Sequence, residues 1–225
     1  MERHFDEELK LLKNKLLEMA GAVEQAIYHS VKSLVNREEK LANDVIQNDR
    51  KINDLELEVE DLCLKLLALH QPMAVDLRFI AAAMKINNDL ERMGDQAVNI
   101  AERATDLLTQ PPLKPLTDIP RMAEEAQKMV KDSIDAFVNG DAARAQEICR
   151  RDSVVDSLND QVFRELLTYM LASPNNIERA LDLVLVSRHL ERIADHATNI
   201  AEEVIYIVEG KVIKHHHLDD QAAQP

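Results

Sequence analysis

The residues NNDLERMGDQAVNIAE, at positions 87–102, are the stretch that decides the fold. They return 100 positions later as SRHLERIADHATNIAE, at positions 187–202, with nine of the sixteen residues identical. A repeat of this kind predicts two similar halves, each of them one supersecondary unit.

Apolar residues run through each copy at alternating spacings of three and four, which is typical of one buried helical seam. The seam extends from Phe79 to Leu107 in the first copy and from Leu183 to Ile207 in the second. A pattern Glu-x-x-x-Asp-x-x-x-Asn occurs identically in both copies. At about 100° per residue its members fall opposite the seam, so they are predicted to face outward. A solvated helix face is the simpler interpretation, but the identity of the pattern in both copies points to a function.

The composition is that of an acidic, helical protein. The chain has 225 residues, with 41 acidic and 27 basic side chains and a formal net charge of −14, but only four glycines and no tryptophan. This charge argues against nucleic acid as a primary partner, because binding phosphates needs clustered Lys and Arg. The acidic start has no signal-peptide pattern, and no run of about 20 apolar residues occurs, so the sequence predicts a cytoplasmic protein. Cys63 and Cys149 lie within helical patterns and are predicted to be reduced thiols.

Breaks in the helical pattern divide the chain into six long helices. We expect helices at about residues 4–35, 38–69, 73–108, 117–139, 141–171 and 173–209, with Thr117 and Ser173 as N-caps and Asn139-Gly140 as a C-terminal signal. Short turns between long helices require antiparallel neighbours. The predicted fold class is all-α, with two tandem antiparallel three-helix bundles at residues 1–109 and 118–214. A proline-rich linker, QPPLKPLT, occupies residues 110–117, and a polar tail occupies residues 215–225.

Antiparallel pairing about the turns near residues 71–72 and 173–174 brings acidic residues of neighbouring helices to the same height. Each half is predicted to bring together four residues, two from each of two neighbouring helices. The first quartet is Asp49, Asn53, Glu91 and Asp95, and the second is Asp152, Asp156, Glu191 and Asp195. Carboxylates so close together repel one another. Four arginines, Arg50, Arg92, Arg151 and Arg192, can supply part of the compensating charge, and a divalent or trivalent metal ion can supply more. Oxygen-only ligands suit divalent or trivalent cations such as Mg²⁺, Mn²⁺, iron or an oxygen-ligated Zn²⁺. A metal-free acidic surface is the alternative.

Motifs of common enzyme classes are absent. The sequence has no Gly-rich phosphate loop, no G-x-S-x-G and no H-E-x-x-H. His189 and His196 flank the second quartet and are interpreted as ordinary surface histidines. The run His215–His217 in the tail is at most an adventitious metal ligand. The sequence therefore predicts a protein that is not an enzyme.

The repeated stretch resembles the signature of the PhoU family. The resemblance rests on DLERMGDQAVNIAE at residues 89–102, on Gln71-Pro72 followed by Asp76-Leu77-Arg78, and on residues 189–202, and it extends over residues 4–214. It implies a cytoplasmic negative regulator of phosphate uptake and of the phosphate-starvation response, which links the ATPase subunit of a phosphate ABC transporter to a membrane sensor histidine kinase. It further implies two three-helix bundles, a homodimer, and metal clusters on Glu/Asp-x-x-x-Asp motifs. Asn53 stands where the family pattern has an acid, which implies a weaker first site.

Three hypotheses follow for the function. The first is a non-catalytic adaptor whose bundle faces bind partner proteins, with bound metal ordering an acidic surface. The second is a metal-dependent hydrolase or oxidase in a helical bundle, which needs a dry pocket and an inward base. The third is a structural coiled-coil dimer.

Overall fold

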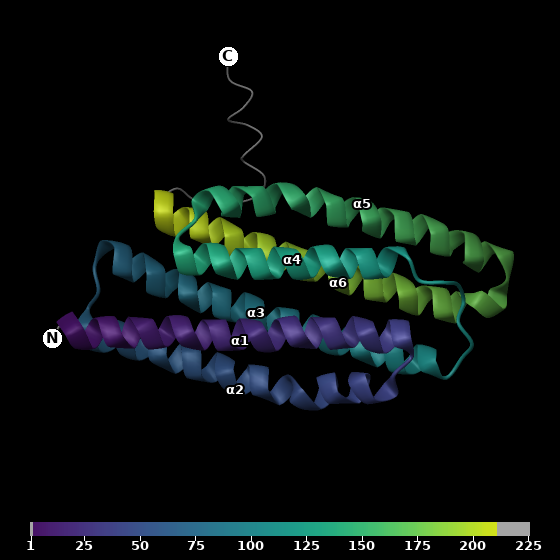
Figure 1. The fold of residues 1–225 in the computed structure, drawn as a ribbon, viewed down its shortest axis with the longest axis horizontal. Coiled ribbons are helices and arrows are strands. Elements are labelled where there is room, and N and C mark those ends of the chain that lie inside the picture. The colour runs from purple at the N-terminus through teal and green to yellow at the C-terminus, as the bar shows by residue number, and fades with distance from the viewer. Residues whose placement is uncertain (1, 211–225) are drawn as a thin grey trace, which may run out of the picture.

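The structure is a computed structural model, and it describes residues 2–210. Its six long helices are α1 (Glu2–Asn36), α2 (Glu39–His70), α3 (Ala74–Leu108), α4 (Asp118–Asn139), α5 (Ala142–Ala172) and α6 (Ile177–Glu209), with a short 3₁₀ helix, η1 (Pro174–Asn176), before α6. Helices α1–α3 form one antiparallel bundle and α4–α6 form a second one beside it (Figure 1). The predicted fold class is confirmed. The predicted tail, including His215–His217, lies outside the described residues.

The helix ends follow from local sequence signals in most places. Gly140 ends α4 in the left-handed conformation, with φ 63° and ψ 38°, as the Asn-Gly pair predicted. Asp141 caps α5 by accepting the backbone N–H of Arg144 at 3.0 Å, and the Ser173 hydroxyl accepts from the N–H of Asn175, which opens η1 rather than α6 directly. Thr117 occupies the N-cap position of α4 as predicted, but its side chain makes no capping hydrogen bond.

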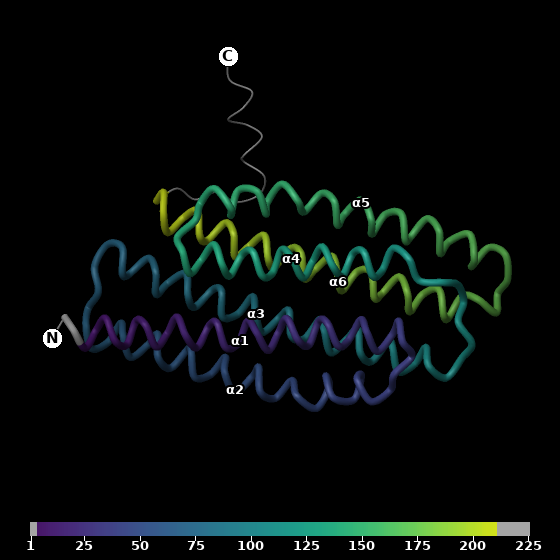
Figure 2. The backbone as a smooth tube through the Cα atoms, viewed as in Figure 1, coloured from purple at the N-terminus to yellow at the C-terminus, as the bar shows by residue number. Residues whose placement is uncertain are grey.

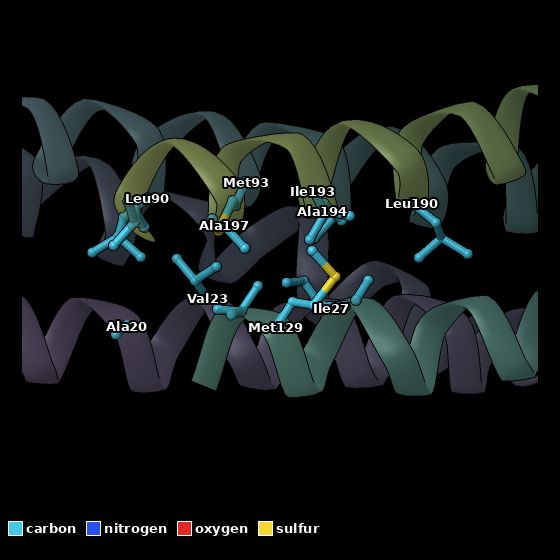
Figure 3. Close-up of a cluster of buried hydrophobic side chains, with 14 of the residues drawn as sticks. Ala20, Val23, Ile27, Leu90, Met93, Met129, Leu190, Ile193, Ala194 and Ala197 are labelled. Atoms are coloured by element: carbon cyan, nitrogen blue, oxygen red, sulfur yellow. The ribbon is translucent and has the colours of Figure 1, made fainter. Parts of the chain in front are cut away.

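One hydrophobic core runs through both bundles. The seam residues Leu90 and Leu190 have no exposed surface, and the cluster they belong to includes apolar side chains of all six long helices. Figure 3 shows side chains of α1, α3, α4 and α6 meeting, including Val23, Met93, Met129 and Ile193. Each seam therefore buries itself against the other half as well as within its own bundle.

Helices α3 and α6 pack against each other in antiparallel orientation. Two polar contacts between them are related by an approximate two-fold exchange of α3 and α6. His196 Nδ1 lies 2.9 Å from Asp89 Oδ1. At the equivalent place, His189 Nδ1 donates to Gln96 Oε1 at 2.8 Å. Residues 89 and 96 are the counterparts of residues 189 and 196, so the two pairs exchange positions across the interface. The prediction that these histidines are ordinary surface residues is wrong, since both are partly buried between the bundles.

The chain crosses between the bundles at residues 109–117, visible at the right of the backbone trace (Figure 2). Arg37 at the end of α1 donates to the backbone carbonyls of Leu108 and Gln110 at 2.9 and 2.7 Å. Arg179 of α6 donates to the carbonyl of Pro111 at 3.0 Å. The two arginines hold the connecting segment from both sides.

Two further predictions concern the cysteines and the membrane. Cys63 and Cys149 are both free thiols, and burial raises the pKa of each to about 12. They are thus protonated and unreactive at neutral pH. Among the helices within residues 2–210, none has the length and apolar character of a membrane span.

Candidate functional site

The first acidic cluster lies where α2 crosses α3. Asn53 donates its amide to Asp49 Oδ2 at 3.0 Å, so two of the predicted residues are joined directly. Gly94 of α3 faces them, because a Cβ built on it would lie 3.1 Å from Ile52 Cδ1 and 3.6 Å from Asp49 Oδ1. The absence of a side chain at residue 94 lets α2 approach closely and brings Asp49 next to the turn that carries Asp95.

Glu91 and Asp95 of α3 lie within electrostatic range of Asp49. Burial raises the pKa of Glu91, and the charges of Asp95, Glu56 and Asp49 raise it further, while Arg92 lowers it. Burial and the charge of Asp49 likewise raise the pKa of Asp95, although the Asp95 side chain is exposed. The first quartet is therefore brought together, and its carboxylates repel one another.

The second cluster lies on α5 and α6. Burial and the charge of Asp156 raise the pKa of Asp195. Burial raises the pKa of Glu191 as well; Arg188, whose guanidinium lies 3.8 Å from the Glu191 carboxylate, opposes this, while Asp195 and Asp156 add to it. Asp156 and Asp195 are exposed, whereas Asp152 is buried.

Each cluster borders an open groove. Asp152 and Asp195 line one of about 620 Å³ on the boundary between the bundles, together with Lys85, Arg192 and His196. Asp49 lines another of about 420 Å³, whose walls come mainly from α1 and α2 and include His29 and Lys51. Three of the eight predicted residues, Asp49, Asp152 and Asp195, thus line grooves that are open to solvent.

The predicted counter-charges behave differently from one another. Arg151 does not serve the second quartet, because its guanidinium bonds Glu125 and Asp132 of α4 at 2.7 and 2.6 Å. Arg50 is exposed and lies 4.0 Å from Asp54, an arrangement that contributes little. Arg92 and Arg192 do lower the pKa values of the neighbouring glutamates. The clusters keep a surplus of negative charge.

The donor set fits a hard cation in its chemistry. Asp49 Oδ1 is buried and has no hydrogen-bond partner among the described residues, which leaves an oxygen lone pair for a ligand. As the side chains stand, however, no three His, Cys, Asp or Glu side chains within residues 2–210 converge to hold a metal ion. Like charges repel, so carboxylates on neighbouring turns spread apart unless a cation lies between them. A cation would therefore be held only if the carboxylates of a cluster moved toward one another.

One residue of the first cluster was missed by sequence reasoning. Glu56 lies one turn beyond Asn53 and acts on the pKa of Glu91, and its backbone carbonyl accepts the amide of Asn87 at 3.0 Å. The pairing argument that placed Asp49 level with Asp95 also places residue 56 level with residue 87. Searching only for spacings of four residues left Glu56 out.

A family model described as the PhoU domain matches the chain twice, at residues 16–104 and 119–204. The phosphate-specific transport system accessory protein PhoU homolog of Aquifex aeolicus is 45% identical over 95% of this chain and 97% of its own length. The PhoU homolog 2 of Thermotoga maritima is 35% identical over 96% and 92%.

Two solved structures share the fold. The crystal structure of PhoU from Pseudomonas aeruginosa superposes with a TM-score of 0.89 at 39% identity, covering 92% of this chain and 100% of that one. The phosphate transport system regulatory protein PhoU from Streptococcus pneumoniae gives 0.87 at 28% identity, covering 94% and 100%. Both the repeated domain and the full-length similarity show that this chain belongs to the PhoU family.

Proposed function

We propose that this protein regulates phosphate transport as a non-catalytic adaptor in the cytoplasm. In this proposal it binds the ATPase subunit of the phosphate ABC transporter and a phosphate-sensing histidine kinase, and it restrains both uptake and the starvation response. The observation that carries the proposal is the doubled PhoU domain, since full-length relatives are named accessory proteins of the phosphate-specific transport system.

The surface supports an adaptor better than an enclosed reaction site. Two long bundles lie side by side and present extended helical faces (Figure 1). The acidic clusters line open grooves, and the net charge of −14 favours partners with basic surfaces. Long helical faces of this kind leave room for more than one protein, and for a second copy of the chain in a homodimer.

We further propose that oxygen-ligated divalent or trivalent cations such as Mg²⁺, Mn²⁺, iron or Zn²⁺ bind both clusters. The residues that would hold them are the two quartets: Asp49, Asn53, Glu91 and Asp95, then Asp152, Asp156, Glu191 and Asp195. A bound cation would supply positive charge that cancels the repulsion among these carboxylates. The protein's own part is to keep Glu91 and Glu191 half-buried on helices, so that rigid backbones set where the oxygens can reach.

Co-purification from the native host tests the adaptor. Tagged protein is expected to retain the transporter ATPase and the sensor kinase, and a deletion strain grown in ample phosphate is expected to switch on a starvation-response reporter. Recovery of neither partner, with an unchanged reporter, would leave the plain structural scaffold as the better interpretation. Sedimentation analysis of the same protein tests the homodimer.

Elemental analysis tests the cations. Protein purified without chelator is expected to carry bound metal that is lost in an Asp95→Asn/Asp195→Asn variant, while helix content stays unchanged because both residues are exposed. Wild-type protein that takes up no metal at micromolar free Mn²⁺ or Mg²⁺ would contradict this part of the proposal and leave the adaptor standing.

A further inference from the structure

Large apolar side chains are exposed where α5 and α6 meet at the end of the second bundle. Phe163, Leu167 and Leu171 recur at every fourth residue near the end of α5, with 50, 41 and 80% of their surfaces exposed. Ile177 and Leu181 follow in the first turns of α6, with 47 and 50% exposed. Single exposed leucines are common, but a contiguous group of large apolar side chains marks an interaction site. We call these five residues the α5–α6 apolar patch.

The two rows of the patch lie at the same height on neighbouring helices. Helices α5 and α6 pack against each other and run antiparallel about η1, at the right-hand end in Figure 1. Leu171 and Ile177 are equally far in sequence from Pro174, and so are Leu167 and Leu181. Each pair therefore places one apolar side chain of α5 level with one of α6.

Both rows also point to the same side of the bundle. Asp152 of α5 and Asp195 of α6 line one groove. Phe163 follows Asp152 by about three helical turns, and Ile177 precedes Asp195 by about five, so each projects in the direction of the acid on its own helix. The patch is therefore one continuous surface on the side of α5 and α6 that carries these acids.

Equivalent positions of the first half show that the fold does not require this patch. Helix α2 aligns on α5 with Val59 at Val162 and Cys63 at Leu166, all four buried, and α3 aligns on α6 at the 100-residue repeat. The patch residues then correspond, in order, to Glu60, Leu64, Ala68, Leu77 and Ala81, which are all exposed. A glutamate and two alanines satisfy the same packing, so burial in the bundle does not explain the apolar residues of the second half.

Acidic residues accompany the patch and indicate what it can bind. Its basic neighbours Arg164 and Arg188 each lie near an acid, Asp160 at 3.7 Å and Glu191 at 3.8 Å. Asp156, two turns before Phe163, is a further exposed acid on this side, and the whole chain carries −14. This charge disfavours an anionic lipid surface or a second copy of the chain, and it attracts a basic segment.

We propose that the α5–α6 apolar patch docks a basic amphipathic helix of a partner protein. The inference rests on the proposed adaptor function and deepens it, because it names one docking surface and the kind of segment that fits. Two neighbouring helices with apolar rows accept a third helix whose apolar residues recur at spacings of three and four. The row on α5 spans about 12 Å, which corresponds to about two turns of the partner helix, with its Lys and Arg side chains toward Asp156 and Asp160.

Fluorescence anisotropy with the full-length protein tests the docking. The probe is a labelled helical peptide of about 14 residues, made of Leu, Lys and Ala, with the leucines on one face and the lysines on the other. Leu171→Gln/Leu181→Gln is expected to weaken peptide binding by about tenfold. Both positions are exposed, and circular dichroism confirms that helix content is retained.

Ala68→Gln/Ala81→Gln is the matched control, because it places the same side chains at the corresponding exposed positions of the first half. It is expected to bind the peptide within about twofold of the wild type. A scrambled peptide of the same composition, which has no apolar face, is expected to bind about tenfold more weakly. Equal binding of the two peptides, or of the two double variants, would overturn the proposal, since charge alone would then account for binding.

Co-purification with the same variants separates the patch from the adaptor function as a whole. Leu171→Gln/Leu181→Gln is expected to recover less of the transporter ATPase or of the sensor kinase than the control does. If it recovers both as the wild type does, the role of the patch is overturned and the adaptor function stands. If the wild type recovers neither, the adaptor function fails, and peptide binding still decides on the patch. A wild-type dimer that Leu171→Gln/Leu181→Gln converts to a monomer in sedimentation would assign the patch to a second copy and overturn the proposal.

Discussion

The first and second halves of the molecule have similar residues at equivalent core positions and different residues at equivalent polar positions. Leu90 and Leu190 are equally buried, and the helices that carry them have equivalent neighbours. Outside that core, with α5 aligned on α2 at a shift of 103 residues, exposed Asn53 corresponds to exposed Asp156, half-buried Glu56 to buried Asn159, and exposed Asn48 to half-buried Arg151. The comparison teaches that packing fixes the apolar core positions, while the polar positions around the core are where the two halves acquire different chemistry.

The largest expected effect tests the equivalence of the interiors. Leu90→Ala and Leu190→Ala are each expected to lower the free energy of unfolding by about 2–5 kcal/mol, because each leaves a cavity in a filled core. Urea unfolding monitored by circular dichroism measures both. Since one cluster of buried side chains spans both bundles, each variant is expected to unfold in a single transition. Two separated transitions would show that the halves are independent.

The contact between His189 of α6 and Gln96 of α3 is expected to respond to pH. Burial, with Arg192 and Arg103 nearby, lowers the pKa of His189 from 6.5 to about 4. The unfolded chain therefore binds the proton first, and stability is lost as pH falls from about 6.5 to about 4, by at most about 3 kcal/mol. His189→Gln is expected to remove this loss, measured as the difference from wild type across that pH range.

Gln96→Ala is the control for that experiment. It removes the hydrogen-bond partner of His189 without removing the titrating ring, so it is expected to lower stability at neutral pH and to retain the acid-dependent loss. An unchanged pH dependence in His189→Gln would contradict the assignment to His189.

Arg151 and Asn48 offer a third contrast. Arg151 joins α5 to α4 through Glu125 and Asp132. Burial alone would raise the pKa of Asp132, but Arg151 and Arg144 hold it below its usual value. Arg151→Met is expected to lower the free energy of unfolding by about 1–3 kcal/mol. Asn48 is exposed, and its amide donates to the Asp44 carbonyl of its own helix, so Asn48→Ala is expected to change this free energy by no more than about 0.5 kcal/mol. Thermal unfolding of the two variants measures the contrast, and equal losses would contradict it.

The smallest effect concerns repulsion within the clusters. The pKa values of Glu91 and Glu191 are raised, so the charged form of each destabilises the folded protein at neutral pH. In chelator-treated protein, Glu91→Gln and Glu191→Gln are expected to stabilise by a few tenths of a kcal/mol at pH 7. This gain is expected to vanish as pH falls through the raised pKa of the glutamate, where wild type is itself neutral. Destabilisation at pH 7 would mean that the carboxylates make favourable contacts.

Most of the fold could be predicted because the seams, prolines and Asn139-Gly140 are local signals. The pairing of helices about tight turns also placed Asp49 near Asp95 without coordinates. Contacts between the halves could not be predicted in this way. The seams of α3 and α6 look the same whether they pack within a bundle or against each other, so the burial of His189 and His196 was missed. The orientation of Arg151 toward α4 depends on how that helix is rotated, which its own sequence leaves open.

Arg37 and Arg179 hold the short segment that joins the two duplicated halves. A short, clamped tether keeps two units at an effective concentration of about millimolar or higher. The halves therefore resemble the partners of a dimer whose association has been made permanent by covalent attachment. Cleavage between Pro112 and Lys114 would convert this attachment into an ordinary equilibrium between fragments, and the shared core would then form or dissolve according to dilution.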